Sequence, residues 1–319
     1  MGFLYMLEKI RTPFLDAFFS AATRLGEELV FMAVAIVIFW CVSKRHGYFI
    51  LACGFIGTVA NQVLKLVFRI PRPWVKDPSF TIVESAREEA TGYSFPSGHT
   101  QNAATTFGGI ARSSGNKAIR IISLICLVLV AFSRMYLGVH TPLDVFVSLL
   151  IGAVLVLALY PLFSSEERFA RSMPYLLLSM LLFGAAYLIY VSVVAGRDGG
   201  ADENVVSGLE NAYKLTGALA GMLVAYALDR RFIKFRTEGN ILCQVLKILL
   251  GLLVILLIKE GLKPLFGLIT DSAAMDAARY FILVVVAGAV WPMTFPFFER
   301  ITARPYSALL SRFGKKKGD

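Results

Sequence analysis

The sequence predicts an all-α membrane protein, a bundle of about nine transmembrane helices preceded by an amphipathic helix at the membrane surface. Hydrophobic residues make up 57% of the 319 residues and charged residues only 17%. The mean hydropathy is +0.67, which lies outside the range of soluble domains. The apolar residues form segments of about 20 residues, long enough to cross a hydrocarbon core. Backbone polar groups must be paired in lipid, so such segments fold as helices.

The predicted elements begin with residues 3–24, which combine large apolar side chains with Glu8, Lys9, Arg11 and Asp16. This amphipathic pattern is too charged to span a membrane, so we expect an interfacial helix. Nine spans are predicted after it, at residues 28–43, 48–69, 98–114, 118–139, 142–163, 174–195, 207–228, 241–262 and 278–298.

A polar break at residues 164–168 separates the first five spans from the last four. We therefore predict a core of residues 1–163, which contains three polar clusters at residues 65–73, 96–99 and 133–144, and an appended bundle of about four helices at residues 164–319 without an assigned role. The two parts show no convincing internal repeat, which argues against an inverted-repeat transporter.

The charges of the loops predict how the protein is oriented in the membrane. One set of loops collects more than half of the 32 Lys and Arg residues, which marks the cytoplasmic side and places the C-terminus there. The three polar clusters fall on the opposite side, so we expect any site that they form to face out of a bacterial plasma membrane. The net charge of +10 largely reflects these loops, and no nucleic-acid partner is expected.

Three polar clusters interrupt the apolar sequence, and the first is Lys65 with Arg72 and Pro73. An ionisable residue at a membrane span is a functional-site hypothesis by default. An arginine fork can bind two phosphate oxygens while the lysine acts as a point charge. The alternative is a pair of cations that snorkel to the membrane edge.

The second cluster, Pro96-Ser97-Gly98-His99, precedes the third predicted span. Ser97 is a candidate N-cap, and Gly98 lets the backbone approach a ligand closely. The free amides of a helix N-terminus favour an oxyanion, and His99 can present a proton at the same place. The alternative is a serine cap followed by an interfacial histidine.

The third cluster joins Ser133 and Arg134 to His140 and Asp144. We expect Thr141 to cap the fifth span, with Asp144 in its first turn, where the helix dipole favours an acid. Asp144 can accept a hydrogen bond from one imidazole nitrogen and leave the other as a nucleophile. Arg134 can add a cation. The alternative is a structural ion network.

Together the clusters resemble the tripartite signature of the type 2 phosphatidic acid phosphatase superfamily, whose members are integral-membrane lipid phosphatases. The matching residues are Lys65-x6-Arg72-Pro73, Pro96-Ser97-Gly98-His99 and Ser133-Arg134-x5-His140-x3-Asp144. Order and spacing agree throughout, and the resemblance covers about residues 1–163. It implies a bundle of membrane helices with the active site near the outer membrane face.

The resemblance also implies roles for the residues. His140 would attack phosphorus to give a phosphohistidine, with Asp144 orienting it. His99 would protonate the leaving oxygen and later activate water. The residues expected to bind the phosphoryl oxygens are Lys65, Arg72, Ser97, Gly98 and Arg134.

No metal or other cofactor is expected. Three cations and a helix N-terminus can neutralise the phosphoryl oxygens, which is work that metal ions do in soluble kinases. No carboxylate pair or His-rich set stands beside the motifs, and all four cysteines lie in apolar segments, so a zinc site has no support.

The sequence therefore predicts a metal-independent lipid phosphatase whose partners are a lipid phosphate substrate and the bilayer. Prenyl diphosphates such as undecaprenyl diphosphate, phosphatidylglycerol phosphate and phosphatidic acid are all candidate substrates, and an outward-facing site favours recycling of a polyprenyl carrier. Phosphotransfer to a lipid or sugar hydroxyl is one alternative. A lipid transporter or scramblase that uses the phosphate site for head-group recognition is another. The sequence assigns neither protein partners nor an oligomeric state.

Overall fold

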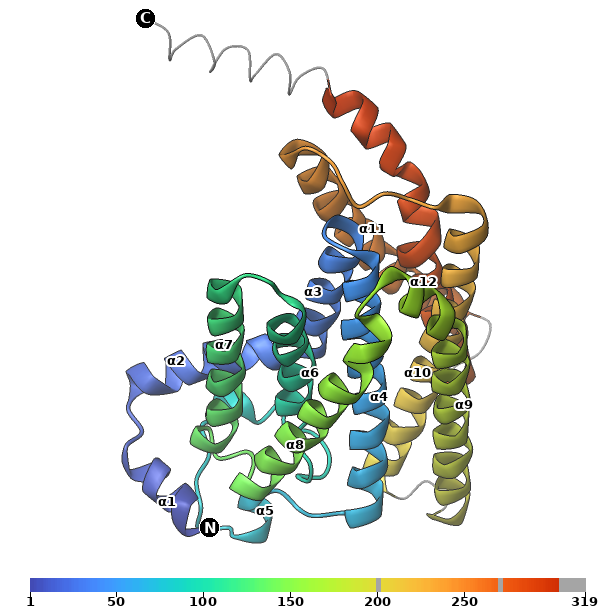
Figure 1. Cartoon of the computed structure of the whole chain (residues 1–319). Coiled ribbons are helices and arrows are strands. Elements are labelled where there is room, and N and C mark those ends of the chain that lie inside the picture. The colour runs from blue at the N-terminus through green and yellow to red at the C-terminus, as the bar shows by residue number, and fades with distance from the viewer. Residues whose placement is uncertain (199–201, 269–271, 304–319) are drawn as a thin grey trace, which may run out of the picture. The chain divides into compact units, whose positions relative to one another are not determined.

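The computed structural model describes residues 1–198, 202–268 and 272–303, and within them every regular element is helical (Figure 1), as predicted. These residues form two compact units. The first contains Met1–Ala35 and Tyr48–Ala212, and the second contains Ile36–Gly47 and the described residues from Tyr213 onward. All three polar clusters belong to the first unit. The division predicted after residue 163 stays a prediction.

The N-terminal segment forms two α-helices, not the single helix expected over residues 3–24. Helix α1 covers Gly2–Lys9 and α2 covers Pro13–Thr23, followed by a short 3₁₀ turn, Arg24–Gly26. The break arises because Thr12 is extended and caps α2, whose first residue is a proline. Met6, Ile10, Phe14 and Phe18 remain exposed in this segment.

Helix α2 runs across α7 (Lys117–Tyr136) and packs against it (Figure 1). The polar residues of the N-terminal segment make part of this contact. Arg11 Nε donates to the Tyr136 carbonyl at 3.1 Å, and the Tyr136 hydroxyl donates to Asp16 Oδ1 at 2.8 Å. Arg11 and Asp16, which make this segment too polar to span a membrane, therefore attach it to the rest of the first unit.

Six helical segments of the described residues are long and apolar enough to cross a membrane, at residues 44–76, 117–136, 142–163, 166–197, 241–267 and 274–303. The other three predicted spans correspond to α3 (Glu28–Cys41), α6 (Gly98–Ser113) and α10 (Glu203–Leu228). Helices α3 and α6 have 14 and 16 residues, fewer than the 20 or so of a typical span. The count of nine is thus not confirmed.

The centre of the first unit is α6, which packs against both α7 and α8 (Pro142–Leu159). A Cβ at Gly152 would lie 2.4 Å from the Cβ of Ala104, so glycine is needed for α8 to approach α6 this closely. The approach brings the N-terminus of α6 beside that of α8. Helix α4 (Lys44–Phe68) carries Lys65 in its last turn.

The second unit contains α11 (Ile241–Gly267) and α12 (Ala274–Val285) and none of the three motifs. Its one fully buried lysine among the described residues, Lys247, is accounted for by local contacts. Lys247 Nζ donates to the Glu238 carbonyl at 2.8 Å and lies 4.7 Å from the ring centroid of Phe295. These contacts are those of a structural lysine.

Candidate active site

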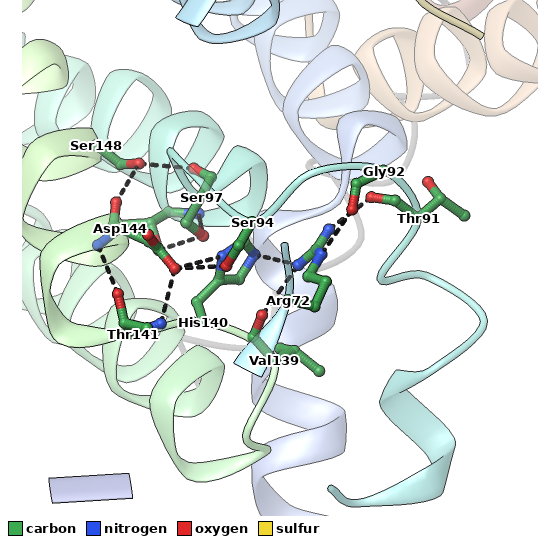
Figure 2. Close-up of polar contacts among 11 residues, drawn as sticks. Arg72, Thr91, Gly92, Ser94, Ser97, Val139, His140, Thr141, Asp144 and Ser148 are labelled. Carbon is green, nitrogen blue, oxygen red and sulfur yellow. Dashed lines mark hydrogen bonds and ion pairs between the residues drawn. The ribbon is translucent and has the colours of Figure 1, made fainter. Parts of the chain in front are cut away.

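His140 lies between Arg72 and Asp144, and all three side chains are buried (Figure 2). Arg72 NH1 is 2.8 Å from His140 Nε2, and Asp144 Oδ2 is 3.5 Å from His140 Nδ1. A guanidinium can only donate hydrogen bonds, so Nε2 must be the acceptor. The proton of the neutral ring is then on Nδ1, which faces the carboxylate. This tautomer leaves a lone pair on Nε2, as a nucleophile requires.

Asp144 is held by its own helix start and by one residue that sequence reasoning missed. Thr141 and Asp144 form a capping box at the N-terminus of α8, with the Thr141 amide donating to Asp144 Oδ2 at 2.8 Å. This confirms the predicted cap. The Ser94 hydroxyl also donates to Oδ2, at 2.6 Å. The two donors hold the carboxylate in place beside the histidine.

The N-termini of α6 and α8 are joined through Ser148. Its hydroxyl contacts the carbonyls of Ser97 and Asp144, each at 2.9 Å (Figure 2). The Ser97 amide in turn donates to the Asp144 carbonyl at 3.3 Å. The second and third motifs are thus tied together by backbone contacts as well as by side chains.

Arg72 is clamped by carbonyl oxygens. Its Nε donates to Gly92 at 3.0 Å, NH2 donates to Thr91 at 2.6 Å, and NH1 donates to Val139 at 3.1 Å (Figure 2). With the contact to His140, four of the five guanidinium N–H groups have partners. A phosphate would therefore compete with His140 for Arg72. Gly92 has a φ of +69°, which favours glycine at this turn.

The second motif forms the start of α6, as predicted. Ser97 is the N-cap, and its Oγ accepts hydrogen bonds from the amide and the hydroxyl of Thr100. A Cβ built at Gly98 meets no atom within 4 Å, so space is open at this helix N-terminus. His99 Nε2 lies 3.3 Å from Glu89 Oε2.

The remaining predicted cations are Lys65 and Arg134. Arg134 is fully buried, and its NH1 donates to Thr23 Oγ1 at 2.7 Å. Lys65 is half-buried on α4. Both act on His140 electrostatically. The structure therefore brings all the predicted site residues to one region of the first unit.

Burial and surrounding charge lower the pKa of His140. Burial is the largest cause, followed by the positive charges of Arg72, Arg134 and Lys65, and together they hold the pKa well below its ordinary value. His140 lies between the end of α7 and the start of α8. The cations that can bind phosphate thus also keep this imidazole unprotonated.

Sequence reasoning missed Thr23, Glu89, Ser94 and Ser148. Ser94 stands two residues before the second motif and Ser148 four residues after Asp144, so their closeness to the motifs was a usable signal. Thr23 is 111 residues from Arg134, and nothing in the local sequence marks it.

Comparison with known proteins gives two family matches. Residues 45–168 match the model of the PAP2 superfamily. Residues 213–302 match a model described as "PAP2 superfamily phosphatase, transmembrane extension".

Individual relatives match about half of the chain. A Dictyostelium discoideum protein named "Probable sphingosine-1-phosphate phosphatase" is 29% identical over 165 residues, which cover 48% of this chain and 39% of that protein. Phosphatidylglycerophosphatase B of Bacillus subtilis is 31% identical over 159 residues, covering 46% of this chain and 74% of that protein. The crystal structure of Aquifex aeolicus LpxE has a TM-score of 0.43 at 30% identity, covering 49% of this chain and 90% of that one. The chain spans from 39% to 62% of the length of the first four curated relatives it matches.

Proposed function

The chain belongs to the PAP2 superfamily, and from this premise we propose that it is an integral-membrane lipid phosphatase that acts through a phosphohistidine and needs no metal ion. One observation carries the proposal. His140 is a buried imidazole whose Nδ1 faces Asp144 at 3.5 Å and whose Nε2 lies 2.8 Å from Arg72 NH1. A cation beside the nucleophilic atom can bind the phosphoryl group that this atom would attack.

In the proposed reaction, His140 Nε2 attacks phosphorus while the bond from phosphorus to the leaving oxygen breaks. The electron pair goes to that oxygen, which takes a proton from the imidazolium form of His99 and leaves this residue neutral. The phosphohistidine ring carries a positive charge, which Asp144 stabilises from 3.5 Å away. Water then loses a proton to His99 and attacks phosphorus, which releases phosphate and restores His140.

The phosphoryl oxygens would be bound by Lys65, Arg72, Arg134, Ser97 and Gly98. The hydroxyl of Ser97 already accepts two hydrogen bonds from Thr100, so its own proton is available to an oxygen of the substrate. The open space at Gly98 supports an anion at the N-terminus of α6. Incoming phosphate would take Arg72 NH1 from His140 and expose the lone pair of Nε2.

We further propose that a polyprenyl diphosphate or another lipid phosphate reaches the site from the extracytoplasmic leaflet of a bacterial plasma membrane, with the C-terminus in the cytoplasm. The distribution of Lys and Arg among the loops supports this orientation. In this arrangement α3, α6 and α10 cross the membrane together with the six segments that are long and apolar enough to do so, which gives nine spans. Residues 1–163 then form the catalytic core and residues 164–319 an appended bundle.

The test is phosphate release by the purified full-length protein in detergent, with a chelator present. The substrates are a prenyl diphosphate, phosphatidylglycerol phosphate, phosphatidic acid, a sphingoid-base phosphate and a soluble phosphomonoester. We expect turnover that His140→Ala abolishes, while His46→Ala, a matched change outside the site, leaves it unchanged. Absence of turnover on every substrate, or activity that survives His140→Ala, would overturn the proposal.

A further inference from the structure

The segment Thr23–Gly26 contacts two of the predicted site residues, although it lies before the residues that match the family. We propose that this segment is part of the active site, where Thr23 positions the guanidinium of Arg134 and Gly26 positions His99. The inference rests on the proposed function, because it assigns these two residues to the same phosphoryl-transfer site. Thr23 and Gly26 would act through Arg134 and His99, so both are positioning residues.

The contact between Thr23 and Arg134 is short and buried. Arg134 NH1 donates to Thr23 Oγ1 at 2.7 Å, and the exposed fractions are 0% for Arg134 and 3% for Thr23. Among the described residues, Arg134 Nε is buried without a hydrogen-bond partner. The hydroxyl of Thr23 therefore supplies the directional contact that fixes the plane of this guanidinium. A guanidinium binds two phosphate oxygens only when its plane is correctly oriented.

Gly26 lies against the first turn of α6. A Cβ at this position would be 2.7 Å from the carbonyl oxygen of His99 and 2.7 Å from Cγ1 of Val130. The Gly26 carbonyl accepts a hydrogen bond from Asn102 Nδ2 at 3.2 Å. Because Val130 is one helical turn before Arg134, the segment bridges the helix that carries the second motif and the helix that carries the third.

The packing of α2 holds the segment in place. Asp16 and Arg11 bind Tyr136 near the end of α7, and the ring of Phe19 lies 4.4 Å from that of Tyr136, centroid to centroid. These contacts attach α2 to Tyr136, which lies two residues beyond Arg134 on α7. A displacement of α2 would thus be transmitted to the guanidinium through Thr23.

The test compares Thr23→Val, which keeps the shape but removes the hydroxyl, with Thr23→Ser, which keeps the hydroxyl. The readout is the inhibition constant of orthovanadate, a phosphate analogue, because this constant does not depend on the fraction of active protein. A hydrogen bond to a charged group corresponds to a factor of about 10 to 100. We expect vanadate inhibition to weaken by that factor in Thr23→Val and to be restored in Thr23→Ser.

Thr12→Val is the matched control, since it also removes a threonine hydroxyl, at the N-cap of α2. Thr12 caps this helix and does not contact Arg134. We expect Thr12→Val to lower the melting temperature but to leave vanadate inhibition unchanged. Equal weakening of vanadate inhibition in both variants would mean that α2 acts only through the stability of the folded protein. That result would overturn the inference.

A double-mutant cycle with Arg134→Ala separates positioning from a general structural effect. If Thr23 acts through Arg134, Thr23→Val has no further effect once the arginine is absent, whereas independent effects would multiply. Multiplying effects would overturn the inference.

Inorganic phosphate that binds the full-length protein should raise its melting temperature, and this protection can be measured without any turnover. It therefore tests the positioning of Arg134 even if the wild-type protein hydrolyses no lipid and the proposed function fails. Protection that is equal in wild type and Thr23→Val would overturn the inference while leaving the proposed function to the turnover assay.

Discussion

Replacing Asp144 with asparagine removes one charge from the site while keeping its shape. The hydroxyl of Ser94 and the amide of Thr141 both donate to Oδ2, and the amide oxygen of asparagine can accept from both. The change therefore isolates the electrostatic effect of the carboxylate on His140. We expect the variant to fold, with the cap of α8 weakened by about 0.3–1 kcal/mol through the lost interaction with the helix dipole.

The expected loss of activity follows from the distance between the two groups. A unit charge 3.5 Å from the phosphohistidine ring contributes at most about 5 kcal/mol at an effective dielectric constant of about 20. The amide dipole of asparagine recovers part of this stabilisation. We therefore expect kcat to fall by about 10²- to 10³-fold in Asp144→Asn.

The assay is the initial rate of phosphate release with the preferred substrate, together with the melting temperature of each variant. Asp77→Asn is the matched control, because Asp77 also accepts side-chain hydrogen bonds, from Tyr5 and Ser79, but lies outside the site. We expect this control to retain full activity. A folded Asp144→Asn protein with kcat within about fivefold of wild type would refute the charge argument, since about fivefold is only 1 kcal/mol.

Three further predictions concern pH, the N-terminus of α6 and metal ions. Protonation of His140 removes the nucleophile, and its pKa is held well below the ordinary value by burial and by the neighbouring cations. The acid limb of a bell-shaped profile of kcat/KM should therefore lie below about pH 6.5, and a limb at or above that pH would contradict the assignment. Gly98→Val places a branched side chain in the open space at the start of α6. It should weaken vanadate inhibition by at least about tenfold without lowering the melting temperature, and unchanged inhibition would argue against an anion there. Chelator treatment should leave the rate unchanged, and a rate restored only by an added divalent cation would refute the metal-independent mechanism.

The parts of the site that could be predicted from sequence are those built by local structure. Ser97 and Thr141 cap their helices through contacts three residues ahead, and such caps are recognisable from residue type and spacing. The partners of Arg72 could not be predicted, because they are the carbonyl oxygens of Thr91, Gly92 and Val139. Every residue has a carbonyl group, so residue types do not reveal which carbonyl will be used.

The extent of the helices was predictable only in part, for a related reason. Hydropathy located a helix at each of the nine predicted positions, but only six described segments are long and apolar enough to cross a membrane, and α3 and α6 are shorter than a typical span. Helix α6 is packed between α7 and α8 and has many small or polar residues. Tertiary packing, rather than its own hydropathy, places such a helix. The break at Pro13 in the N-terminal segment is a local signal that was available in the sequence.

In the proposed mechanism, the cations of the site connect substrate binding to the state of the nucleophile. Lys65, Arg72 and Arg134 would bind the phosphate group, and burial together with the same charges lowers the pKa of His140. A doubly charged phosphate offsets part of this positive charge when it binds, so the ring can accept the positive charge of the phosphohistidine more easily at that moment than before. The lone pair is thus available before the substrate arrives, and the charge formed by its attack is stabilised once the substrate is present. Removing a single cation should therefore weaken phosphate binding and also shift the acid limb of the pH profile towards higher pH.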